Sequence, residues 1–181
     1  MKKFLLILFL CIFHSLAAQN LENVEERVKD LISKMTIEEK ISQLNAVLPN
    51  EIPRLSIPRY VWFNEALHGL VDKGVTVFPQ SIAIAATFDI SLMYKIATAI
   101  SDEGRIKFKQ NKMGLNYWSP NINIFRDPRW CRGQETYGED PYLTSRMAVA
   151  FVKGIQGEDK HYLKAIASPK HFAVHSGPEQ V

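Results

Sequence analysis

From residue 60 onward, the chain alternates between short apolar runs and longer stretches with helical periodicity. Four runs are predominantly apolar and short enough to be strands: residues 60–63, 75–78, 115–118 and 163–168. Ser91 is expected to cap a long helix, and Asp140 to cap another that has Pro141 at its first position and ends at Gly154 or Gly157. Strands that alternate with helices are typical of parallel α/β units, so the sequence predicts an α/β fold.

Two helices are expected before this alternating region. Apolar residues recur every three or four positions from Leu21 to Met35, which indicates an amphipathic helix. Thr36 and Glu39 have the spacing of a capping box, in which the hydroxyl accepts an amide bond and the carboxylate reaches back to the cap. A second helix is predicted to run from Ile37 to Leu48.

The first 18 residues have the features of an export signal. Two lysines follow Met1, an unbroken apolar run extends from Phe4 to Phe13, and small residues up to Ala18 offer a cleavage site. The run is too short to span about 30 Å of hydrocarbon, so no stable membrane insertion is expected, although an uncleaved anchor remains the alternative. We therefore predict a signal peptide at residues 1–18 and an exported protein, periplasmic or secreted, that begins at residue 19.

The charge balance of the chain argues against one class of partner. The formal net charge is +3, and removal of the signal peptide with its two lysines leaves 20 Lys and Arg against 19 Asp and Glu, which is about +1. A protein that binds nucleic acid by neutralising phosphates carries a clear basic surplus. No nucleic-acid partner is therefore expected.

Charged and polar side chains follow the predicted strands at the points where the strands end. They form three groups: Asn64, Glu65 and His68; Arg126, Asp127, Arg129, Arg132 and Glu135; and Lys170 with His171. In a parallel α/β fold the loops after the strands open on one face, where ligands bind. The three groups are therefore expected to converge on one mouth. Each group alone is a weak signal, because a single surface charge is usually solvated.

Metal, nucleophile and cofactor chemistries have little support in the sequence. His171 and His175 have the spacing of metal ligands, but the Glu that follows the first His of a metalloprotease helix is missing, and no metal site is predicted. The motifs of serine hydrolases, P-loop enzymes and dinucleotide-binding folds are also missing, so no cofactor is expected. Cys131 is the only cysteine after the signal peptide, and no base is positioned beside it.

Three tryptophans lie in or next to predicted strands and loops: Trp62, Trp118 and Trp130. An aromatic ring can stack on the apolar face of a sugar, which would make these residues part of a carbohydrate site. An aromatic residue beside a strand more often belongs to the core. We therefore favour the core interpretation for the three rings and keep sugar stacking as the alternative.

Several longer strings together resemble a known family. They are Met35–Ile41, Trp62–Gly69, Phe78–Ser81, Ser119–Asn123, Phe125–Pro141 and Lys170–Gly177. They resemble the N-terminal domain of family 3 glycoside hydrolases, and the Asn-Glu-Ala-Leu-His-Gly string is similar to the β-xylosidase and α-arabinofuranosidase branch. The resemblance implies that residues 19–181 are the N-terminal portion of the family's barrel domain. The expected fold is the first part of a TIM-like (β/α)8 barrel, incomplete in this chain.

The resemblance implies a substrate-binding role for four residues. In the family, a carboxylate before the Ala-x-His-Gly string, an arginine in the Arg-Gly-x-Glu string and a Lys-His pair after a strand hold the non-reducing sugar. The matching positions are Glu65, Arg132, Lys170 and His171. Charged partners suit a sugar with adjacent hydroxyls, because charge-assisted hydrogen bonds are the stronger kind and tighten toward an oxocarbenium-like transition state.

The catalytic residues that the resemblance implies are not assigned in this chain. The retaining mechanism of the family needs an aspartate nucleophile and an acid/base carboxylate, both expected downstream of Val181. Asp127, Glu135 and Glu139 are interpreted as members of ion pairs that brace a loop. The full-length protein is expected to be the enzyme, with oligosaccharide as its substrate. The chain alone is expected to be inactive and to supply part of the sugar pocket.

Glu65 bears on the substrate class. Relatives that favour glucosides tend to carry aspartate here, and the longer glutamate is expected to reach toward the place of a hexose C6 hydroxymethyl group. We therefore expect release of terminal β-D-xylose, or a related pentose, from plant-type oligosaccharides. Three alternatives stay open: a β-glucosidase of the same family, a non-catalytic carbohydrate-binding fragment, and a Glu65 that only pairs with Arg132 and selects nothing.

Overall fold

The computed structural model describes residues 24–45, 47–111, 113–172 and 175–178. The predicted signal peptide lies outside these residues. No helix among them is long and apolar enough to cross a membrane. The chain divides into two compact units, and each is considered by itself.

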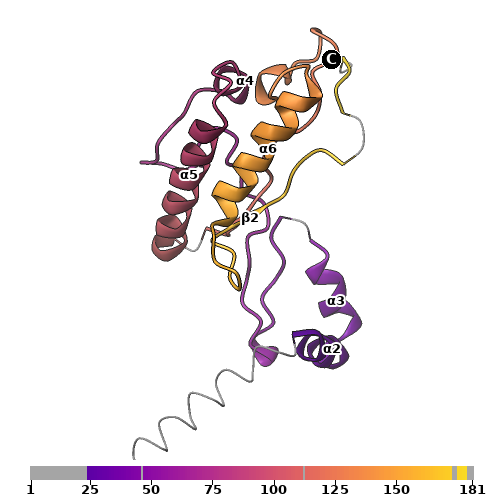
Figure 1. Cartoon of the computed structure of the whole chain (residues 1–181). Helices are drawn as coiled ribbons and strands as arrows, with labels where there is room; N and C mark the ends of the chain where they lie inside the picture. Colours follow the sequence, from indigo (N-terminus) through magenta and orange to yellow (C-terminus); the bar gives the residue numbers. More distant parts are fainter. Residues whose placement is uncertain (1–23, 46, 112, 173–174, 179–181) are drawn as a thin grey trace, which may run out of the picture. The chain divides into compact units, whose positions relative to one another are not determined.

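The first unit is made of the residues up to Asn45 together with Asn50–Pro58. It contains helices α2 (Val24–Lys34) and α3 (Ile37–Gln43) and the 3-10 helix η1 (Pro53–Leu55) (Figure 1). The helix predicted from the apolar periodicity before Thr36 is confirmed by α2 over the described residues. Neither α2 nor α3 has a buried residue, so their apolar stripes are not fully covered.

The predicted capping box joins α2 to α3 and is confirmed. Thr36 Oγ1 accepts the amide of Glu39 at 3.2 Å, and Glu39 Oε2 accepts the amide of Thr36 at 2.8 Å. The Arg54 guanidinium also bonds Glu39 and holds the pKa of that carboxyl below its usual value. The predicted extension of α3 to Leu48 is wrong. Leu44 is 82% exposed, and without packing a further turn is marginal.

The second unit is made of residues 46–49 and 59–181. Its core is built on helices α5 (Ile90–Asn111) and α6 (Pro141–Gln156), which lie side by side (Figure 1). A Cβ added at Gly154 would lie 2.6 Å from the Cβ of a residue on α5, so glycine is what permits this close approach. A short helix that was not predicted, α4 (Ser81–Ala85), also contributes buried residues to this core.

The caps of α5 and α6 test two sequence predictions. Asp89 caps α5, because its Oδ1 accepts the amide of Leu92 at 2.9 Å, and the prediction of Ser91 as the cap is wrong. A carboxylate is the stronger acceptor at the positive end of a helix. The prediction for α6 is confirmed: Asp140 accepts the amide three residues later, and the helix ends before Gly157, whose φ is +73°.

Two of the four predicted strands are present, and both are short. Strands β1 (Asn116–Tyr117) and β2 (Ile166–Ala167) pair in parallel, with α6 between them in the chain. An isolated parallel bridge joins Asn121 to Lys170 further along the same two segments. This alignment brings the residues that follow β1 beside the residues that follow β2.

Residues 60–63 were predicted as a strand and are not one. Side-chain amides take the place of the backbone amides that would donate hydrogen bonds in a regular strand pair. Asn116 Nδ2 donates to the carbonyl of Trp62 at 2.9 Å, and Asn64 Nδ2 donates to the carbonyl of Asn116 at 3.1 Å. The segment therefore lies beside β1 without regular strand pairing.

Residues 75–78 were also predicted as a strand, and that prediction is wrong as well. The amide of Thr76 donates to the Glu103 carboxylate, so it is not available to a neighbouring strand. Gly69 (φ +121°) turns the chain back at this place, and an added Cβ would collide with the carbonyl of Thr76. The turn brings the amide of Phe78 to a backbone carbonyl just before that glycine.

Candidate functional site

Glu65 and Lys170 form a largely shielded ion pair in the second unit. Lys170 Nζ lies 2.6 Å from Glu65 Oε1, and the two side chains are 12% and 20% exposed respectively. Ser119 Oγ donates to the other carboxylate oxygen at 3.2 Å. The partner of Glu65 is thus Lys170, and the interpretation that Glu65 only pairs with Arg132 is wrong.

Arg132 and Glu135 form a second ion pair with two contacts. Arg132 Nε lies 2.8 Å from Oε1 of Glu135, and Nη2 lies 2.7 Å from Oε2. Asn121 Nδ2 donates to Oε2 at 3.3 Å. Burial alone would raise the pKa of the Glu135 carboxyl, but the hydrogen bonds from Arg132 and Asn121 and the charges of Arg132 and Lys170 hold it below its usual value. Glu135 is therefore ionised near neutral pH.

The imidazole of His171 is held from one side by Asn123. Both the backbone amide and Nδ1 of His171 lie within hydrogen-bond distance of Asn123 Oδ1, at 3.0 and 2.8 Å. Burial is the main cause that lowers the pKa of His171 to about 4, and the charges of Arg132, His175 and Lys170 add to it. The imidazole is therefore neutral near pH 7.

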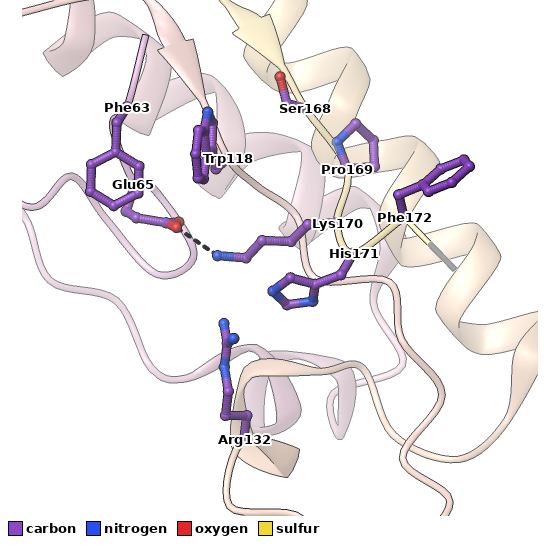
Figure 2. Close-up of a pocket in the computed structure, with 9 residues that line it drawn as sticks. All are labelled: Phe63, Glu65, Trp118, Arg132, Ser168, Pro169, Lys170, His171 and Phe172. Atoms are coloured by element: carbon purple, nitrogen blue, oxygen red, sulfur yellow. Dashed lines mark hydrogen bonds and ion pairs between the residues drawn. The ribbon is translucent and has the colours of Figure 1, made fainter. Parts of the chain in front are cut away.

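These side chains meet in one pocket of about 490 Å³, within the usual range for small-molecule sites (Figure 2). It is lined by Phe63, Glu65, Trp118, Arg132 and residues 168–172. Figure 2 shows Glu65 and Lys170 pointing toward each other, with the Arg132 guanidinium directed toward them from below in this view. The four residues proposed from the resemblance come from three separate segments, and the structure brings them together.

A second hollow of about 450 Å³ shares part of this lining. It is lined by Glu65, residues 67–72, Val77, Arg132, Glu135 and Lys170. Glu65, Arg132 and Lys170 face both hollows and therefore stand between them. A ligand in the first pocket can be contacted by these three residues without entering the second.

The three tryptophans have different surroundings. Trp130 is 2% exposed and belongs to the buried part of the unit, as favoured from the sequence. Trp118 lines the pocket and packs edge-on against Phe63, with ring centroids 4.7 Å apart. Trp62 is 42% exposed. The core interpretation is therefore correct for Trp130 and wrong for Trp62, while Trp118 is placed where sugar stacking is possible.

Other residues of the predicted polar groups are directed elsewhere. His68 Nδ1 lies 2.9 Å from a backbone carbonyl, and of the two hollows His68 lines the second. Arg126 donates to Ser176 Oγ at 2.9 Å. Arg129 and Asp127 form the predicted loop-bracing ion pair, and Arg129 is 74% exposed. Of the middle group, Arg132 lines the pocket, and its partner Glu135 lines the second hollow.

Three residues that support the pocket were missed from the sequence: Ser119, Asn121 and Asn123. They occupy every second position of the Ser-Pro-Asn-Ile-Asn string just after β1. In an extended segment this spacing puts side chains on one face, and a polar face directly after an apolar strand was the signal available. All three are buried.

His171 and His175 are neighbours, with ring centroids 4.7 Å apart. A metal ion needs further ligands around such a pair. Within the described part of the chain, no group of three or more His, Cys, Asp or Glu side chains is arranged to hold one. The ring of His175 instead lies between His171 and Trp130.

Residues 16–180 match the sequence model of the glycosyl hydrolase family 3 N terminal domain. The chain belongs to this family. It is 46% identical to a xylan 1,4-beta-xylosidase of Xylanibacter ruminicola, over 96% of the chain and 22% of that protein. It is 45% identical to beta-D-xylosidase 3 of Arabidopsis thaliana, over 84% of the chain and 22% of that protein.

Solved structures of the family are similar as well. A GH3 exo-beta-xylosidase (XlnD), in complex with a xylobiose aziridine activity-based probe, matches 83% of the chain and 21% of its own length, with a TM-score of 0.78 and 35% identity. Beta-glucosidase 3B of Thermotoga neapolitana, in complex with alpha-D-glucose, matches 81% of the chain and 23% of its own length, with a TM-score of 0.65 and 26% identity. The α/β fold of the chain is therefore a part of the family's TIM-like barrel. The chain spans about a fifth of the length of these relatives.

Proposed function

We propose that the full-length protein is an exo-acting, retaining β-xylosidase and that this chain supplies part of its sugar pocket. The observation that carries the proposal is the Glu65–Lys170 ion pair, which lines one pocket together with Arg132 and His171. The relatives reported above include proteins named as xylosidases, which supports the same assignment.

The chemistry of the pocket suits a sugar with neighbouring hydroxyl groups. Arg132 and Lys170 can only donate hydrogen bonds, whereas the Glu65 carboxylate can only accept them. Each hydroxyl of a sugar can do both, so it can accept from one of these groups while it donates to another. The side chains of Lys170 and Glu65 are each at most 20% exposed, which limits competition from water.

The length of Glu65 supports a pentose substrate. Its carboxylate is held in the pocket by Lys170 and Ser119 and extends one methylene beyond an aspartate. A hexose adds a hydroxymethyl group at C5, which needs space that a pentose does not use. A methylene-sized conflict is worth about 1–3 kcal/mol, or roughly 10- to 200-fold in kcat/KM.

Glu135 and Asp127 do not fit the role of the general acid in the proposed mechanism. A general acid needs a raised pKa so that it holds a proton near neutral pH, but the pKa values of Glu135 and Asp127 are both lowered. Both are also held by arginines. We therefore assign the nucleophile and the acid/base to other parts of the full-length protein.

The test is hydrolysis of paired aryl glycosides by the purified full-length protein. With p-nitrophenyl β-D-xylopyranoside and β-D-glucopyranoside as substrates, we expect kcat/KM for the xyloside to be higher by roughly 10- to 200-fold. The first product observed by NMR should be β-xylose, because a retaining mechanism keeps the anomeric configuration.

Each alternative has its own outcome in the same experiment. A preference for the glucoside would make the protein a β-glucosidase and overturn the pentose assignment. Hydrolysis of neither substrate, combined with binding of D-xylose in calorimetry, would indicate a non-catalytic carbohydrate-binding protein. Arg129→Ala serves as the control variant: Arg129 is outside the pocket, so its removal should leave the ratio of the two activities unchanged.

We further propose that the protein is exported, with residues 1–18 as its signal peptide and residues 19–181 in the barrel domain. The proposal rests on the two lysines after Met1 and the apolar run from Phe4 to Phe13. Mass spectrometry of the protein recovered from the periplasm and the medium should give a mature N-terminus after Ala17 or Ala18. An intact Met1 in that material would contradict cleavage.

A further inference from the structure

The segment from Ser119 to Asn123 contacts pocket residues, or the partner of one, at every second position. Ser119 Oγ donates to Glu65 Oε2, and Asn121 Nδ2 donates to Glu135 Oε2. The backbone of this segment is aligned with Lys170: the amide of Lys170 donates to the carbonyl of residue 120, and the amide of residue 122 donates to the carbonyl of Lys170. A segment with buried polar side chains thus fixes the backbone at Lys170 and the side chains around it.

Asn123, the third of these residues, determines which nitrogen of His171 carries the proton. The backbone amide of His171 can only donate, so the Asn123 atom that faces it at 3.0 Å must be the side-chain oxygen. His171 Nδ1 lies 2.8 Å from the same oxygen, which cannot donate to it. Nδ1 must therefore carry a hydrogen. In the neutral imidazole, Nε2 is then the unprotonated nitrogen and an acceptor.

The surroundings of His171 favour this neutral form. The charged and titratable groups that face the ring are Arg132, Lys170, His175 and Glu135. Arg132 and Lys170 oppose a further positive charge, and Glu135, which favours one, is already paired with Arg132. Within the described residues, Nε2 has no hydrogen-bond partner, and Figure 2 shows the ring extending into the space between Lys170 and Arg132.

We propose that Asn123 is a positioning residue, which holds His171 as the Nδ1–H tautomer so that Nε2 accepts a hydrogen bond from a sugar hydroxyl. This inference rests on the proposed glycosidase function for its ligand, but not for the tautomer itself. His171 then complements its neighbours, because Lys170 and Arg132 donate to the sugar while His171 accepts from it. Protonation at Nε2 would replace the acceptor with a donor, and a flip of the ring would put a carbon in place of the nitrogen.

The first test reads the tautomer without any turnover. The full-length protein is prepared with 15N-labelled histidine rings, and a His171→Gln spectrum assigns the His171 signals. At pH 7 we expect a protonated Nδ1 and an unprotonated Nε2 in the wild type. In Asn123→Ala we expect the two nitrogens to approach averaged values, because either tautomer then becomes possible. A protonated Nε2 in the wild type would overturn the proposal.

The second test separates positioning from general stability. With p-nitrophenyl β-D-xylopyranoside, Asn123→Ala should lower kcat/KM by about tenfold, the scale of one hydrogen bond. The same substitution in a His171→Ala background should have no further effect, because the residue through which it acts is gone. Equal losses in both backgrounds would assign Asn123 a purely structural role. Asn50→Ala, in the other unit and exposed, is the matched control.

Asn123→Asp completes the experiment, because its carboxylate also accepts from Nδ1. The tautomer should be retained, but the added negative charge should raise the pKa of His171 and move the acid limb of the kcat/KM profile to higher pH by at least one unit. An unshifted acid limb would argue against His171 as the acceptor. If the wild-type protein hydrolyses no glycoside, the proposed function fails, while the NMR result still decides the tautomer.

Discussion

Two arginines in one loop, Arg129 and Arg132, make nearly the same ion pair in different surroundings. Arg129 contacts Asp127 through Nε at 3.0 Å and Nη2 at 2.6 Å, and Arg132 contacts Glu135 through the same atoms at 2.8 and 2.7 Å. The arginine side chains are 74% and 29% exposed respectively. Only the second pair borders the pocket. Contact geometry alone therefore does not tell a loop brace from a binding residue.

The difference arises from the residues on either side of Arg132. Trp130 is buried, with Phe125 and His175 packed edge-on around its ring at centroid distances of 6.3 and 5.6 Å. Gly133 lies against the ring of Phe125, where a Cβ would collide with it. The second half of the loop is thereby fixed by packing, and Arg132, which lies between Trp130 and Gly133, is positioned to line the pocket.

Replacing each of these two arginines in the full-length protein should give very different losses of kcat/KM. Arg132→Ala should lower kcat/KM for the aryl xyloside on the order of 1,000-fold. The substitution removes a guanidinium that can donate to the sugar, and it leaves the Glu135 carboxylate without its ion-pair partner. Arg129→Ala should stay within about twofold, as expected for an exposed residue. Similar losses in the two variants would erase the distinction between the two halves of the loop.

Lys170 extends the same contrast to the other ion pair of the pocket. Lys170→Ala should lower kcat/KM by about 2–4 kcal/mol, or roughly 30- to 900-fold, because a shielded charged donor to a hydroxyl is lost. Lys153→Ala, an exposed lysine of α6, is the matched control and should have little effect. A loss below tenfold for Lys170→Ala would make Lys170 an ordinary surface lysine.

Glu65 is expected to affect the choice between xyloside and glucoside as well as the activity itself. Glu65→Asp shortens the side chain by one methylene and should reduce the xyloside-to-glucoside ratio of kcat/KM by about tenfold, because the space opposite a hexose C6 group opens. The ratio is the readout, since weaker contact with Lys170 and Ser119 lowers both activities. An unchanged ratio would mean that Glu65 does not select the pentose.

The smallest expected effects are on stability, and they compare the carboxylates of the two loop pairs. Glu135 has a lowered pKa, so its ionised form contributes stability that is present above its ordinary pKa of 4.5 and is lost as the pH falls below it. Glu135→Gln should lower the apparent melting temperature by a few degrees at pH 7, and this difference should shrink in acid. Asp127→Asn should change it by no more than about 1 °C, because the partner Arg129 is 74% exposed and water screens that pair. The reverse ranking in a thermal scan would refute the assignment.

Local signals in the sequence predicted local structure well. The capping box at Thr36 and the Asp140–Pro141 start of α6 depend on neighbours within one turn, and both are confirmed. The strands at 60–63 and 75–78 failed because their polar backbone groups bond to side chains from distant segments, as Thr76 does with Glu103. Such partners are set by tertiary structure, which apolar runs do not report.

The candidate site was predictable in its members but not in its internal contacts. The family strings pointed to Glu65, Arg132, Lys170 and His171, and these residues share one pocket. The pairing of Glu65 with Lys170 was not foreseen, because it joins residues 105 positions apart. The alternating polar positions after β1 were a signal for the supporting segment, but the partners of Ser119, Asn121 and Asn123 are set by tertiary structure.

The most direct test of the central claim is a crystal structure of the full-length protein with bound D-xylose. We expect sugar hydroxyls to lie within about 3.2 Å of side-chain atoms of Glu65, Arg132, Lys170 and His171 Nε2, with Arg129 making no contact. Xylose bound elsewhere, with the Glu65–Lys170 and Arg132–Glu135 pairs untouched by it, would contradict the assignment of this pocket as the sugar site.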